Sequence, residues 1–176
     1  PSGERVEAAT PPDAELEHAD VVLPGVGKAP ERAMRVPHLL GLTPGLRVED
    51  AGDSKRYGLQ SGDVFARVGG VEWPDLPAGI AEVRRHTGRE IALRMLRDGA
   101  FVDLTAKVSR EGTIGFRPGE TSAQMALITG SIERSGGSIE DGPSAASRLD
   151  LPPGSVILEA AGEPIADFGE LRGALI

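Results

Sequence analysis

The most informative pattern of apolar and polar positions lies in residues 57–86. Turn-forming residues occupy positions 60–63, where glycine tolerates a positive φ angle and aspartate can bond its own backbone. The next residues, Val64–Val68, are mostly apolar and rich in β-formers, which predicts a short strand with both faces buried. Gly69 and Gly70 then end this strand.

A helix is expected after this strand. Asp75 suits the N-cap position, Pro77 suits the first turn, and Gly88 is placed to stop the helix. Apolar residues recur at positions i, i+4 and i+7 of one helical face, and these are Leu76, Ile80 and Val83.

A β-hairpin is expected next. Two alternating runs, residues 90–96 and 101–108, are joined by a connection that contains Asp98 and Gly99. An Asp-Gly pair between alternating runs is a strong hairpin signal, so these two strands close the sheet of the unit.

The residues before this unit are less regular. Residues 1–20 are rich in acidic side chains, contain two adjacent prolines and show no periodicity, so they are expected to form an exposed linker or arm. Residues 21–23 suit an edge strand, and residues 30–38 are interpreted as a helical turn that Pro37 ends. Residues 45–50 alternate and predict a strand that leads into the unit.

Much of the unit recurs later in the chain. Leu59 aligns with Leu151, 92 positions further on (151 − 59). The same offset, with no gap, matches Gly62 with Gly154, Val64 with Val156, Phe65 with Ile157, Gly70 with Gly162 and Asp75 with Asp167. We interpret the two segments as copies of one unit of about 90 residues, which is the size of a small domain rather than a solenoid repeat.

The second copy predicts a second helix. Asp167 and Glu170 have the i, i+3 spacing of a capping-box-like start. The apolar stripe of this helix consists of Phe168, Leu171 and Leu175. The matching hairpin would begin near residue 181, beyond the last residue, so either the chain is a fragment cut inside a domain or another segment supplies the missing strands.

Composition narrows the class of protein. The chain has 176 residues, 39% of them hydrophobic and 26% charged, which suffices for one or two modest cores. A net charge of −8 argues against nucleic acid or an anionic membrane as a partner held by bulk electrostatics. The absence of cysteine excludes disulfides and thiolate metal sites, and no apolar run is long enough to insert into a membrane. The first residue is not Met, so we expect a fragment of a longer protein.

Candidate chemistry is sparse. The three histidines, His18, His38 and His86, do not form the H-E-x-x-H pattern of a zinc protease. No G-x-S-x-G elbow or phosphate-binding loop occurs, and scattered carboxylate pairs are expected to be solvated. The sequence therefore predicts no catalytic residues, no metal site and no cofactor in this chain.

Two motifs resemble those of a known family. The run Tyr57-Gly58-Leu59-Gln60-Ser61-Gly62-Asp63-Val64, and in the second copy residues 142–146 (GPSAA) followed by residues 151–157 (LPPGSVI), resemble the PDZ domains of bacteria. Ser155 replaces the aspartate of the first copy, and residues 51–54 match the family's helix start poorly.

The resemblance implies an α+β, mostly β fold with two PDZ-like units. Each unit would be a small, partly open antiparallel β-barrel or sandwich with a helix flanking a peptide groove, and the second unit would be truncated at its C-terminus. The implied boundaries are a linker at residues 1–20, a first domain at residues 21–111 and a second at residues 112–176.

In that family an extended peptide adds to a sheet edge beside the helix, and a Φ-G-Φ loop holds its terminal carboxylate. The residues Thr113-Ile114-Gly115-Phe116 resemble this loop, with Arg110 upstream as a carboxylate-supporting residue, although they equally suit the last strand of the first copy. The implied peptide-binding residues are Leu40, Gly41, Leu42, Leu76, Ile80, Val83, Ile114, Gly115, Phe116, Phe168, Leu171 and Leu175.

A wider resemblance is to the tandem PDZ region of bacterial site-2 proteases, which are membrane-embedded zinc enzymes. This resemblance rests on the segments GDVFARVGGVEWPDL, LRDGAFVDLTAKVSREGTIGF and PPGSVILEAAGEPIADFGELR. It implies a non-catalytic, extracytoplasmic module that gates substrate access on the periplasmic side of the inner membrane. Its partners would be extended or C-terminal peptide segments of a substrate and the catalytic domain of the parent chain. A structural spacer with occluded grooves, or the PDZ pair of a periplasmic serine protease, are the alternatives.

Overall fold

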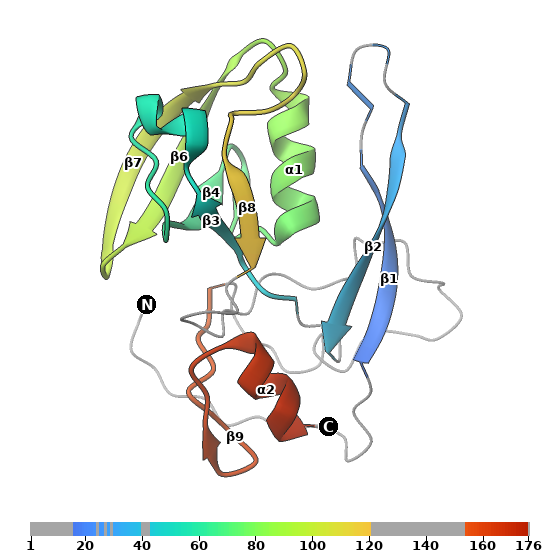
Figure 1. Ribbon diagram of the computed structural model, residues 1–176, viewed down its shortest axis with the longest axis vertical. Coiled ribbons are helices and arrows are strands. Elements are labelled where there is room, and N and C mark those ends of the chain that lie inside the picture. Colours follow the sequence, from blue (N-terminus) through green and yellow to red (C-terminus); the bar gives the residue numbers. More distant parts are fainter. Residues whose placement is uncertain are drawn as a thin grey trace.

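The computed structural model describes residues 16–23, 25–26, 28, 30–39, 43–120 and 154–175. In these parts the chain is mostly antiparallel β-structure with two α-helices and one 3-10 helix (Figure 1). None of the helices in these ranges is long and apolar enough to cross a membrane.

The first unit is built on one antiparallel sheet. Its strands are β3 (Leu46–Asp50), β4 (Val64–Val68), β5 (Val71–Glu72), β6 (Glu90–Arg97), β7 (Ala100–Lys107) and β8 (Arg117–Glu120). Their order is β7-β6-β4-β3-β8, and β5 pairs with β4. The sheet is open rather than a closed barrel, because β7 and β8 stand at opposite ends of this order. The 3-10 helix η1 (Gly52–Tyr57) and helix α1 (Leu76–Arg85) complete the unit.

The core of the first unit surrounds its central strand. Strand β4 lies between β3 and β6, and every residue of β4 except Arg67 is buried. This confirms the prediction of a strand buried on both faces. The most completely buried side chains of the core are those of Val48, Phe65, Val68, Met95 and Val108.

The hairpin and the helix of the first unit are also as predicted. Strands β6 and β7 are joined at Asp98 and Gly99, which both have positive φ angles (49° and 78°), as a type I′ turn requires. Helix α1 begins after Asp75, whose Oδ1 accepts a hydrogen bond of 2.8 Å from the N–H of Ala78. The helix ends at Arg85, before Gly88.

A separate two-stranded hairpin precedes the first unit. Strand β1 (Leu16–Leu23) pairs antiparallel with β2 (Arg32–Leu39) along eight residues of each strand. The prediction of a helical turn at residues 30–38 is therefore wrong. Residues 32–39 are extended because they pair with β1. Pro37 is compatible with this pairing because both strands of a two-stranded sheet are edge strands. Residues 16–20, expected in an exposed arm, form the first part of β1.

The described part of the second unit repeats the first at the offset of 92 residues. Its elements are β9 (Glu159–Ala160), β10 (Glu163–Pro164) and α2 (Phe168–Leu175). The pairing of β9 with β10 has the register of β4 with β5. Three hydrogen bonds of the first unit recur at this offset. The bond from Trp73 N to Ala66 O recurs as Ile165 N to Leu158 O. The bond from Ala78 N to Asp75 Oδ1 recurs as Glu170 N to Asp167 Oδ1, and the bond from Gly79 N to Asp75 O recurs as Leu171 N to Asp167 O.

Candidate functional site

The candidate site is the outer edge of strand β8. Strand β8 pairs with β3 on one side, and none of the strands described in this structure pairs with its other side. Pro118 lies within β8, and proline in a sheet is confined largely to edge strands. Pro118 contributes no N–H, so an incoming strand would pair with the remaining N–H and C=O groups on the outer side of β8, which no described strand contacts by pairing.

Helix α1 flanks this edge. It contacts β8, and Figure 1 shows the two elements next to each other. The predicted apolar stripe divides between two environments. Val83 is buried in the core and Leu76 packs against it, whereas Ile80 is half-buried outside the core cluster. Ile80 is thus the stripe residue that the core leaves partly exposed on α1.

The loop before β8 closes one end of the site. Gly112 and Gly115 both have positive φ angles, 72° and 84°, and the carbonyl of Gly115 accepts a hydrogen bond of 3.1 Å from the N–H of Ser54. Ile114 is buried in the core, and the ring of Phe116 lies 5.1 Å from that of Phe65. These contacts fix the loop in place by its side chains.

The backbone amides of this loop are chemically suited to an anion. No described residue accepts a hydrogen bond from the N–H of Ile114, Gly115 or Phe116, whereas Gly112 and Thr113 donate to Ser109. Successive N–H groups in a turn can bind a carboxylate. The loop therefore combines a fixed backbone with N–H groups available to a ligand.

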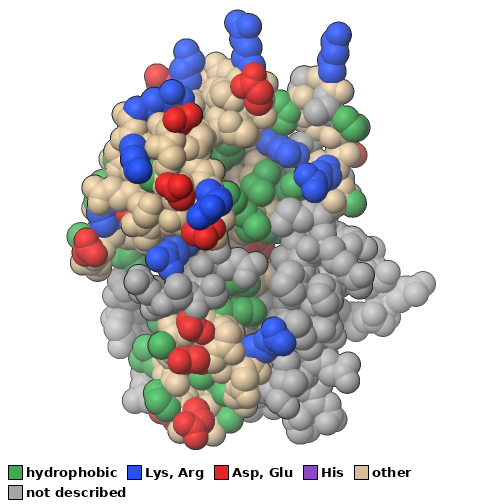
Figure 2. All heavy atoms as spheres, in the orientation of Figure 1, with side chains coloured by type: hydrophobic (Ala, Val, Ile, Leu, Met, Phe, Trp, Pro, Cys, Tyr) green, Lys and Arg blue, Asp and Glu red, His purple; other side chains and the backbone are tan. Residues whose placement is uncertain are grey.

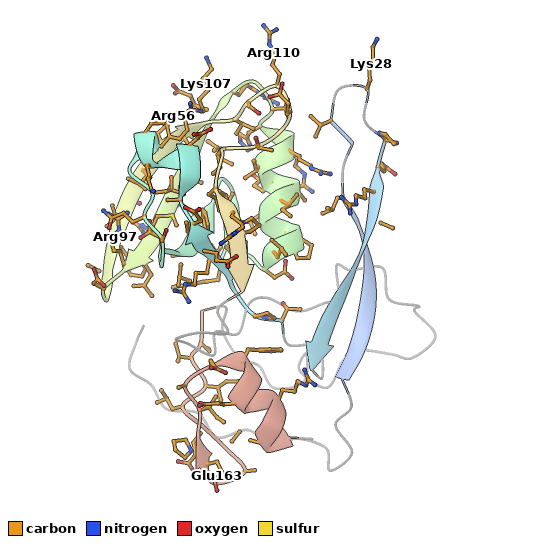
Figure 3. The ribbon with its side chains drawn as sticks, in the orientation of Figure 1. Lys28, Arg56, Arg97, Lys107, Arg110 and Glu163 are labelled. Atoms are coloured by element: carbon orange, nitrogen blue, oxygen red, sulfur yellow. The ribbon has the colours of Figure 1, made fainter. Side chains whose placement is uncertain are left out.

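Two arginines lie near the loop, but their positions differ. Arg110, predicted as a carboxylate-supporting residue, is exposed and points outward from the molecule (Figure 3). Arg84 of α1 borders the loop directly, because a Cβ built on Gly112 would lie 3.2 Å from Arg84 Cγ. Arg84 was not among the site residues predicted from the sequence. Its signal was its position four residues after Ile80, on the same helical face.

Basic side chains gather at the loop end of the molecule. Lys28, Arg56, Lys107 and Arg110 all project from this end (Figure 3), and Figure 2 shows Lys and Arg side chains there with Asp and Glu side chains among them. The chain as a whole carries a charge of −8, so this is a local enrichment of basic residues. It favours the approach of a negatively charged group to the loop, within the range that salt screening allows.

The beginning of α1 is fixed to the sheet by Asp75. The Oδ2 atom of Asp75 accepts a hydrogen bond of 3.2 Å from the hydroxyl of Thr43, and a β-bridge joins Asp75 to Gly45. Burial raises the pKa of the Asp75 carboxyl above its usual value, against the opposing effect of the hydrogen bonds from Ala78 and Thr43. These contacts set the position of α1 relative to β3, and hence to β8.

The middle of α1 is fixed by Glu82, which is buried. Its Oε1 accepts a hydrogen bond of 3.2 Å from the N–H of Gly70, and its Oε2 lies 2.9 Å from Nη1 of Arg85. Burial alone would raise the pKa of Glu82, but the hydrogen bonds from Arg85 and Gly70 and the charge of His86 hold it below its usual value. His86 Nδ1 lies 3.0 Å from the backbone carbonyl oxygen of Glu82, so this histidine contributes to the end of the helix.

The other predicted site residues do not join this site. Leu40, Gly41 and Leu42 lie outside the described residues. Phe168 and Leu171, both of α2, are buried, and the side chain of Leu175 lies outside the described part. A sheet edge flanked by a helix is thus described in the first unit, and within the described ranges no group of three or more His, Cys, Asp or Glu residues is placed to hold a metal ion.

No protein-family model matches the chain, and no curated protein matches it significantly.

Proposed function

We propose that the first unit is a non-catalytic, PDZ-like peptide-binding module. An extended peptide adds as a further strand on the outer edge of β8, beside α1. The N–H groups of Ile114, Gly115 and Phe116 receive its terminal carboxylate. The observation that carries this proposal is a sheet edge with no described strand partner, flanked by a helix and closed by a loop with available amides.

The PDZ assignment draws further support from a buried contact. Asp63, from the motif that resembles the family, is 1% exposed and accepts hydrogen bonds of 2.7 and 2.8 Å from Arg97. Its Oδ2 also accepts from the N–H of Gln60. Asp63 therefore joins the turn before β4 to β6, so the aspartate of that motif has a structural role in this fold.

The role of this module in a longer protein follows from sequence resemblance alone. We propose that the tandem regulates or gates the access of substrates to an attached membrane protease, outside the cytoplasm. Its partners are peptide segments of the substrate and the catalytic domain of the parent chain. The alternative of a structural spacer gains support from one contact of the loop, that of Val26 with Gly112.

The test is a titration of the chain with peptides that have free C-terminal carboxylates, each paired with its C-terminal amide. We expect saturable binding that the amide abolishes, and a loss of about 10-fold or more in affinity for Ile80→Asp, because a charge would be buried against the peptide. Ala81→Asp, on the next residue of the same helix, is the matched control and should bind as the unmodified chain does. Binding that tolerates both amidation and Ile80→Asp would overturn the proposal.

A further inference from the structure

The β1–β2 hairpin lies against the same helix that flanks the candidate site. Strand β1 contacts α1, and Figure 1 shows the hairpin running alongside that helix. Leu23, the last residue of β1, is only 3% exposed, although it stands at the end of a two-stranded pair. The hairpin therefore packs onto the first unit by an apolar contact.

Beyond β1, the chain reaches the loop that closes the site. A Cβ built on Gly112 would lie 2.9 Å from Val26 Cγ2, 3.2 Å from Arg84 Cγ and 3.3 Å from Thr87 Oγ1. The side chain of Val26 thus sits in a corner bordered by the loop on one side and the end of α1 on the other. Val26 is itself half-buried.

This corner is the end of the site at which a bound peptide would terminate. Gly112 precedes by two residues the amides of residues 114–116, which the proposed function assigns to a peptide carboxylate. On that proposed function, the last side chain of the peptide lies against the end of α1, which is the place that Val26 fills. Two basic residues at this end, Lys28 between β1 and β2 and Arg110 before Gly112, project outward from the molecule (Figure 3).

We propose that the β1–β2 hairpin is an intramolecular cover of the loop end of the candidate site, with Val26 filling the corner between the loop and α1. The inference rests on the proposed function, because a cover matters only if a peptide binds. A ligand then has to displace the hairpin, and its apparent affinity is reduced by the fraction of molecules in which the site is open.

The fold makes such a displacement feasible. Among the described strands, β1 and β2 pair with each other and with none of the six strands of the main sheet. Lifting the hairpin therefore breaks no ladder of the first unit and leaves the core around Phe65 intact. Segments held by a few apolar contacts open at a lower free energy than the core does.

The experiment uses the full chain with Val26→Asp, which places a charge in the corner. The matched control is Ala33→Asp, which makes the same change on an exposed residue of β2. Solvent paramagnetic relaxation of the amide protons of residues 112–116 reports how exposed the loop is, and circular dichroism confirms that both variants are folded. The probe ligand is a peptide with the sequence of residues 16–26 and a free carboxylate, compared with its C-terminal amide.

We expect the relaxation at residues 112–116 to rise in Val26→Asp and to stay unchanged in Ala33→Asp. The probe peptide should bind Val26→Asp about 10-fold more tightly than the unmodified chain, as removal of a competing state predicts. Unchanged relaxation in Val26→Asp would overturn the proposal of a cover, whether or not the probe peptide binds. Increased relaxation together with no binding of either peptide form would uphold the cover and refute the proposed function instead.

Discussion

The two repeated segments, residues 64–83 and 156–175, have the same local structure but different surroundings. Turn, strand pair and helix start recur at one offset, down to individual hydrogen bonds. In the first segment, β4 is enclosed by β3 and β6, and Val64 is 8% exposed. In the second, its counterpart Val156 is 38% exposed and Leu158 is 63% exposed.

This difference separates what a short sequence specifies from what distant partners supply. Turns and caps form from residues within a few positions of one another, so they recur. Burial requires strands such as β6 and β7, and no described strand occupies the corresponding place beside residues 156–158. We therefore expect the stability of the two segments to differ far more than their backbones do.

The largest expected effect comes from the core position that the two segments share. Phe65→Ala should destabilise the first unit by about 3–5 kcal/mol, because the ring is fully buried and leaves a cavity. Its counterpart Ile157→Ala should cost about 1 kcal/mol or less, because Ile157 is only half-buried. Urea unfolding followed by circular dichroism measures both. Equal losses would contradict the contrast in burial.

A smaller effect is expected where the two turns differ in sequence. Asp63→Ser copies Ser155 into the first unit and leaves Arg97 without its carboxylate, at a cost of about 2–4 kcal/mol. Asp103→Ser is the control, since it removes an equally paired but exposed partner of Arg94 and should destabilise the fold far less than Asp63→Ser does. Chemical denaturation of both variants measures the two losses in unfolding free energy. If the exposed pair proves the stronger, the structural task given to Asp63 is wrong.

The next prediction concerns a compensating pair. Gly69 has a φ angle of 55°, and a Cβ built there would lie 2.5 Å from Glu82 Oε1, whereas the second unit has Ala161 and Ala174 at these positions. Gly69→Ala should therefore destabilise less in a Glu82→Ala background, with a coupling of about 0.5–2 kcal/mol. A double-mutant cycle measures it, and additive effects would refute the contact.

The smallest expected effect is a pH dependence that only the first unit has, because Ala174 replaces Glu82 in the second. The pKa of Glu82 is lower in the folded protein than its ordinary value of 4.5. Its stabilising contribution is therefore complete above that value and is lost as the pH falls through the lowered pKa. The difference in unfolding free energy between the unmodified chain and Glu82→Gln should shrink below about pH 4.5. A constant difference would contradict this.

The sequence predicted those elements whose signals are local. Asp75, Pro77 and the Asp98-Gly99 pair each specify a cap or turn by themselves, and α1 and the β6–β7 hairpin formed as expected. Strand β2 was missed because its partner, β1, begins 16 residues earlier (32 − 16). Val26 could not be found from pattern alone, since only packing brings the hairpin, the loop and the helix together. Arg84 had a signal in its spacing of four residues from Ile80, but that spacing does not indicate which helical residue borders the loop.

The central claim is that the outer edge of β8 accepts a peptide strand beside α1. The most direct measurement is a set of intermolecular nuclear Overhauser effects between an unlabelled peptide and the ¹⁵N-labelled Val26→Asp chain. We predict contacts from peptide backbone protons to the amide protons of Arg117, Gly119 and Glu120 and to Ile80. Contacts to β7, at the opposite end of the sheet, with none to β8, would contradict the account.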